Sequence, residues 1–132
     1  MEAYKIPDGL YYTKEHEWVK IQGDTATCGI TDYAQHLLTD VVFVELPAAK
    51  KEVKQFGPAC VVESVKSVSD VYAPVGGTIS KVNSELESAP ELINNDPYEK
   101  GWIFQLSGVD VHETSNLMDA AAYKAFIEQN AH

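Results

Sequence analysis

The sequence has only two cysteines, no long apolar run and no recognisable targeting segment. Cys28 and Cys60 are too few for a disulfide framework or a metal cluster, and both lie in apolar stretches where buried free thiols are expected. No apolar stretch is long enough to span a bilayer. The first residues resemble neither a secretory nor an arginine-rich transit segment, so we expect a soluble protein of a reducing compartment.

Basic residues are also scarce. The sequence has 10 lysine and arginine residues against 20 aspartate and glutamate residues, which gives a formal charge of −10. This balance disfavours binding to nucleic acid or to an anionic membrane, and it favours basic partners or simple solubility. With 132 residues and 45% hydrophobic residues, the chain is expected to form one domain, 1–132, with its own core.

Motifs of catalysis are missing from the sequence. We find no G-x-S-x-G, H-E-x-x-H, phosphate-binding glycine loop or Cys-x-x-Cys pair, and the four histidines lack ligand spacing, so no metal site is expected. His16 and Glu17 are neighbours on a predicted strand and should point to opposite faces, which weakens an acid/base pair. The sequence therefore predicts no catalytic site.

Short alternating segments predict a mostly β fold. The expected strands cover 10–13, 16–21, 26–30, 41–46, 59–62, 71–73, 78–83 and 101–106. The stretch 41–46 has the pattern of a buried strand, 48–56 that of a loop, and 84–98 is mainly loop with one helical turn near 91–93. Strand number and spacing indicate a sandwich or flattened barrel, with its core at about 10–110.

Two helices are expected beside the strands. Residues 32–38 have helical spacing after Thr31 or Asp32 as a cap. The tail at about 115–129 is predicted to be helical, with Asp119 as a cap. Its apolar stripe of Tyr123, Phe126 and Ile127 is expected to pack on the core.

The segment 63–70 has the pattern of a hairpin tip. With Val65 and Lys66 as the central turn residues, Ser64 faces Ser67, Glu63 faces Val68 and Val62 faces Ser69. The turn lacks the Asn-Gly or Asp-Gly that supplies positive φ, so we expect ordinary φ values and a Lys66 that projects outward. An isolated lysine at a turn is most often a solvated charge, so this pattern alone does not assign it a function.

The string VESVKSVSDVYAPVGGTI at 62–79 resembles the lipoyl-attachment hairpin of the glycine cleavage system H protein family. Further segments match this family in the same order: HEWV at 16–19, GITDYAQ at 29–35, DVVFVELP at 40–47 and LINNDPYEKGW at 92–102. The resemblance implies a lipoyl-domain fold, a flattened barrel or sandwich of two packed antiparallel sheets with the lysine hairpin at one end. It also implies lipoate as the cofactor, attached to Lys66 by an amide.

The resemblance implies a carrier without a catalytic site of its own, served by three enzymes. Glycine decarboxylase (the P protein) loads an aminomethyl group on the arm, aminomethyltransferase (the T protein) passes its carbon to tetrahydrofolate, and dihydrolipoamide dehydrogenase (the L protein) reoxidises the dithiol. A lipoate ligase or a lipoyl/octanoyl transferase would modify Lys66. The expected location is the cytoplasm of a bacterium or, for a processed eukaryotic protein, the mitochondrial matrix.

Acidic site residues are also carried over from the resemblance. Glu17 and Asp70 fall on the carboxylates of a cleft that shelters the loaded arm, although the residues alone fit two solvated strand acids equally well. Glu63 has two interpretations: it helps lipoylating enzymes recognise the hairpin, or it is an exposed strand acid. Glu15 departs from the serine that many members have, which changes the hydrogen bonding expected in the cleft. The loop around Asn94 matches the family, but its turn chemistry favours a structural role.

Three alternatives remain from the sequence. One is an H-protein-like lipoyl carrier of another pathway, such as sulfur oxidation or lipoyl relay. Another is a biotin carrier or an acyltransferase lipoyl domain, although Val65 and Ser67 flank the lysine where those families have Met-Lys-Met or Asp-Lys-Ala. The third is a structural β-domain without a prosthetic group.

Overall fold

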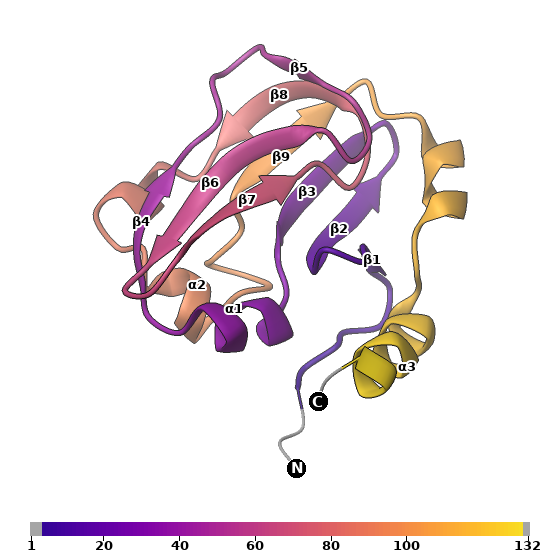
Figure 1. Cartoon of the computed structure of the whole chain (residues 1–132). Coiled ribbons are helices and arrows are strands. Elements are labelled where there is room, and N and C mark those ends of the chain that lie inside the picture. The colour runs from indigo at the N-terminus through magenta and orange to yellow at the C-terminus, as the bar shows by residue number, and fades with distance from the viewer. Residues whose placement is uncertain (1–3, 131–132) are drawn as a thin grey trace.

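The computed structural model describes residues 4–130 and contains two antiparallel sheets (Figure 1). The six-stranded sheet has the order β1-β2-β3-β9-β8-β5, and the three-stranded sheet the order β4-β6-β7. The larger sheet comprises β1 (Tyr11–Tyr12), β2 (Glu17–Gln22), β3 (Thr25–Ile30), β9 (Phe104–Ser107), β8 (Gly77–Val82) and β5 (Glu52–Val53). The smaller comprises β4 (Val41–Glu45), β6 (Pro58–Ser64) and β7 (Val68–Tyr72). This confirms a mostly β fold of two sheets, which are not closed into a barrel.

Short helices connect and flank the sheets. They are α1 (Asp32–Leu38), α2 (Leu92–Asn95), α3 (Ala120–Asn130), η1 (Ser84–Glu87) and η2 (Val111–Asn116), the last two being 3-10 helices. Thr31 caps α1, as expected, because its side chain accepts a hydrogen bond from Ala34 N at 3.1 Å. Asp119, the residue before α3, likewise caps that helix, because its Oδ1 accepts a hydrogen bond from Ala122 N at 2.9 Å. Among residues 4–130 no helix has the length and apolar character needed to cross a membrane.

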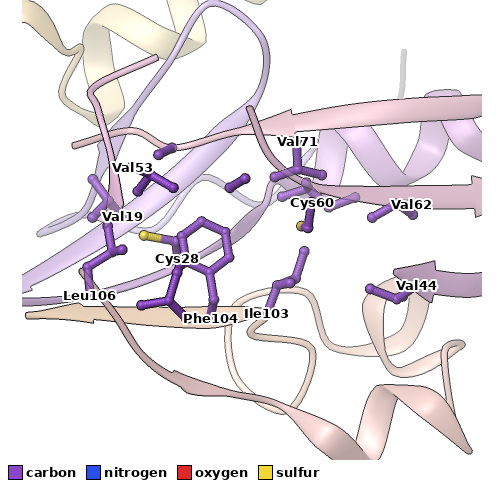
Figure 2. Close-up of a cluster of buried hydrophobic side chains, with 14 of the residues drawn as sticks. Val19, Cys28, Val44, Val53, Cys60, Val62, Val71, Ile103, Phe104 and Leu106 are labelled. Carbon is purple, nitrogen blue, oxygen red and sulfur yellow. The ribbon is translucent and has the colours of Figure 1, made fainter. Parts of the chain in front are cut away.

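The core lies between the two sheets and is filled by aliphatic side chains (Figure 2). Cys28 and Cys60 point into it as buried free thiols, which confirms the prediction. Burial raises the pKa of Cys60 to about 12 and that of Cys28 well above its ordinary value. Both thiols therefore stay protonated at neutral pH and act as small apolar side chains.

The sequence patterns placed several element boundaries wrongly. Strand β4 was expected to be buried, yet Val42 is 53% exposed and Phe43 48%, because β4 is the edge of its sheet and its register shifts between Val41 and Phe43. The predicted loop at 48–56 contains β5, which pairs with β8. The two 3-10 helices were not predicted. Gly101 and Trp102 precede β9 rather than forming part of it.

Helix α3 packs on the larger sheet through Tyr123 and Ile127, which are 0% and 4% exposed, so the predicted packing of the apolar stripe is confirmed. The Tyr123 ring stacks on Tyr12 with 4.7 Å between centroids. Its hydroxyl lies 2.9 Å from His16 Nδ1 and 2.7 Å from Thr31 Oγ1. One hydroxyl thus joins α3 to the turn before β2 and to the cap of α1.

Tyr123→Phe is expected to lower the free energy of unfolding by about 1–2 kcal/mol, because it removes a buried hydroxyl with two polar partners. Urea denaturation followed by circular dichroism measures this difference. Tyr11→Phe is the matched control, since Tyr11, the first residue of β1, is only partly buried. A loss for Tyr123→Phe no larger than that of the control would contradict the bridging role.

Candidate functional site

Lys66 lies at the tip of the hairpin between β6 and β7. Ser64 N donates to Ser67 O at 2.8 Å, Glu63 faces Val68, and neither central residue has a positive φ. The predicted register and ordinary backbone conformation are therefore confirmed.

The tip presents the Lys66 amine to solvent. Lys66 and its neighbour Val65 are exposed, and no carboxylate in residues 4–130 forms an ion pair with Lys66. The buried Ser64 accepts hydrogen bonds at its Oγ from the backbone N–H groups of Lys66 (3.3 Å) and Ser67 (3.1 Å). A side chain thus stiffens the turn from inside while the amine remains accessible to an enzyme.

A cavity of about 550 Å³ lies beside the first strands. Its walls include the turn before β2, the end of β7, and the end of η2 with the two residues that follow it. The lining residues are Tyr12, Thr13, Lys14, Glu15, Glu17, Phe56, Tyr72, Ser115, Asn116, Leu117 and Met118. Tyr72 lies four residues from Val68 along β7, roughly 13 Å at the usual rise per residue, so this strand leads from the hairpin to the cavity.

Glu17 is the buried carboxylate of this cavity, with 1% of its surface exposed. Its Oε1 accepts a hydrogen bond from Thr13 Oγ1, and its Oε2 accepts from Tyr72 N at 3.1 Å. Burial raises the pKa of Glu17 to about 7; the two hydrogen bonds oppose the rise, and the charge of Glu15 adds to it. The side chain therefore changes charge near neutral pH.

His16 and Glu17 have different surroundings, but strand alternation is not the reason: β2 begins at Glu17, and His16 lies in the turn before it with a positive φ of 72°. The His16 ring lies against Tyr33 and Tyr123, whereas Glu17 faces the cavity. Burial lowers the pKa of His16, with the charge of Glu15 opposing the shift. His16 is therefore part of the packing of α3 and is not a partner of the carboxylate.

Asp70 and Glu63 lie elsewhere. Asp70 is exposed on β7 opposite Val61, and it is not among the residues that line the cavity. Glu63 is half-buried opposite Phe43 and Val68, whose exposed side chains place all three on the outer face of the smaller sheet. The structure thus brings Glu17 and Glu15 together at the cavity and leaves Asp70 and Glu63 outside its walls. The roles expected of Asp70 and Glu63 stay predictions.

Sequence reasoning missed most of the cavity wall. Phe56 and Tyr72 had no distinguishing pattern, and residues 115–118 were assigned only to a helical tail. Thr13 had one usable signal, because a hydroxyl four residues before a carboxylate can bridge a tight turn between two strands. Among the described residues 4–130 there is no group of three His, Cys, Asp or Glu side chains suited to a metal ion.

Comparison with known proteins identifies the family. The family model described as glycine cleavage H-protein matches residues 10–130. The chain belongs to this family. It is 52% identical over 124 residues to a glycine cleavage system H protein of Symbiobacterium thermophilum, covering 94% of this chain and 97% of the relative. It is 51% identical over 126 residues to one from Thermus thermophilus, covering 96% of this chain and 98% of that relative.

A solved structure of the same family supports the fold. The crystal structure of a glycine cleavage system H protein from Mycobacterium marinum superposes with a TM-score of 0.81 at 35% identity. The match covers 96% of this chain and 100% of the other. Family membership and the two-sheet fold are thus supported by sequence and structure alike.

Proposed function

We propose that this protein is a lipoyl carrier of the glycine cleavage system and that lipoate is attached through an amide to Lys66. The observation that carries this proposal is the exposed Lys66 amine at the tip of the antiparallel β6–β7 hairpin. Family membership favours this pathway, because the relatives described above carry the glycine cleavage name.

The residues present fit a lipoyl group. Attachment needs a lysine whose unprotonated amine can attack an activated lipoyl carbonyl. Lys66 is exposed and forms no ion pair within the described chain, so neither burial nor a bound carboxylate blocks this attack. The cavity volume of about 550 Å³ is in the range of small-molecule sites. Its wall combines apolar side chains such as Phe56 and Leu117 with one buried carboxylate, Glu17. A largely apolar arm with a cationic end suits such a lining.

When bound, the lipoyl group supplies the disulfide that accepts reducing equivalents and carries the aminomethyl group between enzymes. The chain supplies placement: the hairpin holds the attachment point in solvent, where separate enzymes can reach it. Tethering raises the effective concentration of the arm at each of these enzymes. We therefore assign the protein a carrier role without catalysis of its own.

We propose that Glu17 selects the cationic state of the arm. An ionised carboxylate in a shielded cavity attracts a cation strongly, because little water screens the pair. A cation near Glu17 would in turn favour the ionised form and lower the pKa of the carboxyl group below 7. Thr13 Oγ1 and Tyr72 N hold the two oxygens in place. We retain Asp70 as a second proposed carboxylate for the arm: it is exposed on β7, the strand that contributes Tyr72 to the cavity wall.

The proposed partners are those implied by the family: glycine decarboxylase, aminomethyltransferase, dihydrolipoamide dehydrogenase and a lipoate ligase or lipoyl/octanoyl transferase. The bacterial relatives make the bacterial cytoplasm the proposed location. We treat the whole chain as one carrier domain. A lipoyl carrier of sulfur oxidation or lipoyl relay is not favoured, because the relatives described above are named for glycine cleavage.

Release of carbon dioxide from carboxyl-labelled glycine tests the pathway. With purified glycine decarboxylase and its pyridoxal phosphate, the lipoylated protein should stimulate release in a saturable manner, while the unmodified protein should not. The H protein of Thermus thermophilus serves as a positive control for the decarboxylase. If that control stimulates release and this protein, when lipoylated, does not, the proposed pathway is wrong.

A further inference from the structure

The side chain of Asn94 forms hydrogen bonds with the end of α1 and the start of β4, at the end of the molecule where the hairpin tip lies. Asn94 is in α2, which lies beside α1 (Figure 1). All three of its side-chain hydrogen bonds go to residues of α1, of β4 or of the turn between them. Its Nδ2 donates to Thr39 O at 2.7 Å and to Gln35 Oε1 at 3.0 Å, and its Oδ1 accepts from Val41 N at 2.9 Å. One amide thus binds the backbone on both sides of Asp40.

The backbone at this corner is strained. Thr39 has φ 64° and ψ −146°, which lies near a region that is essentially restricted to glycine. A β-branched residue remains there only when its surroundings fix the conformation. The hydrogen bonds from Asn94 to Thr39 O and from Val41 N to Asn94 are contacts of this kind, since they act directly before and after the turn.

The corner in turn holds the hairpin tip. Asp40 O accepts a hydrogen bond from Val65 N at 3.0 Å, and Val41 is paired with Ser64. Val65 immediately precedes Lys66, so the backbone next to the modified lysine is attached to a third strand as well as to its own hairpin partner. Hydrogen bonds therefore link the Asn94 side chain to the Lys66 turn in series, through the backbone of residues 39–41.

We propose that Asn94 is a positioning residue for Lys66: it fixes the corner at 39–41, and this corner fixes the angle and rigidity of the hairpin tip. The inference rests on the proposed function, because it concerns how Lys66 is presented to a lipoylating enzyme. Turn chemistry alone predicts only a structural role for Asn94, whereas this proposal gives its side chain a role in presenting Lys66 to the enzyme.

Asn94→Ala tests the proposal, with Asn95→Ala as the matched control. Asn95 is the next residue of α2 and is exposed, and its side chain makes no hydrogen bond within the described chain that spans the corner. The first measurement is native-state hydrogen exchange of the unmodified protein. Asn94→Ala should speed exchange of the Val65 amide by about tenfold or more, as expected for loss of about 1.4 kcal/mol of local protection. The Val19 amide in the core should change by much less.

The second measurement is the kinetics of lipoylation by a lipoate ligase with lipoate and ATP, at a temperature where all variants are folded. Apparent affinity falls with the fraction of molecules whose tip is correctly placed. If Asn94→Ala lowers this fraction to about one third to one tenth, KM should rise by about three- to tenfold, with kcat within a factor of about two. A loss of global stability alone would not produce this split, because the folded fraction remains close to one.

The outcomes separate this inference from the proposed function. If Val65 exchange and KM are the same in Asn94→Ala and Asn95→Ala, the positioning role is overturned. Equal acceleration at Val65 and Val19 would also overturn it, since that pattern reports global destabilisation. If the native protein is not lipoylated at all, the proposed function fails, and the exchange data still decide whether Asn94 holds the tip.

Discussion

Replacing Lys66 by arginine is expected to reduce glycine-dependent exchange of bicarbonate carbon to the level measured without a carrier. Arginine keeps the positive charge at the exposed hairpin tip, but its guanidinium stays protonated and does not form the lipoyl amide. The assay uses purified glycine decarboxylase and protein that has first been treated with lipoate ligase. Because the side chain projects into solvent, the substitution should leave the free energy of unfolding unchanged.

Lys54→Arg and Lys81→Arg are the matched controls for this experiment. Both lysines are exposed, and Lys81 is on β8 in the other sheet. Both variants should retain the exchange activity of the native protein. Retention of more than half of that activity by Lys66→Arg would show that another residue carries the arm.

The second large expected effect is a change in the free energy of unfolding with pH, caused by the titration of Glu17. In the unfolded chain its pKa should be near the ordinary 4.5, whereas in the folded protein burial raises the pKa to about 7. Between these values the folded state binds more protons than the unfolded state, so stability falls as pH rises. The contribution of Glu17 is fully present below pH 4.5 and is lost as pH rises to about 7, a loss of about 3 kcal/mol.

Glu17→Gln removes this titration and provides the comparison. Urea denaturation from pH 4.5 to about pH 8 should show the native protein losing about 3 kcal/mol relative to Glu17→Gln as pH rises. Glu128→Gln on the exposed side of α3 controls for the substitution itself. A constant difference between the native protein and Glu17→Gln across this range would contradict the raised pKa of the buried carboxylate.

Much of the β structure and the hairpin could be predicted from local pattern. The hairpin register follows from the two residues placed at the turn, and the capping of α1 by Thr31 follows from residue type. The burial of Glu17 also had a local signal, because strand alternation places it on the same face as Val19 and Ile21. A carboxylate on an apolar face is expected to be either tilted to solvent or held by hydrogen bonds; here Thr13 and Tyr72 hold it.

Long-range contacts account for most of what the sequence did not predict. Helix η2 forms a wall of the cavity because Gln55 Nε2 donates to Glu113 O at 2.9 Å and Gly76 N donates to Glu113 Oε1 at 2.8 Å. These partners are 58 and 37 positions apart, and neither has a periodic pattern that indicates the contact. The same applies to Asn94, which lies 55 positions from Thr39.

Strand β4 shows a second reason for error. A continuous run of apolar residues at 41–46 is typical of a strand buried on both faces. In the structure this run forms a sheet edge with an irregular register, and Phe43 lies on the outer face beside Glu63. The exposed apolar side chains of β4 could not be foreseen, because strand order is a property of the whole sheet.

Mapping the site of lipoylation tests the central claim most directly. The chain has ten lysines and no arginine, so a lipoate ligase has ten side chains to choose from. After treatment of the native protein with lipoate, ATP and ligase, peptide mass spectrometry should find one lipoyl group per chain, and it should be on Lys66. A modification on any other lysine, or an unmodified Lys66 after a relative's H protein has been fully lipoylated under the same conditions, would contradict the account.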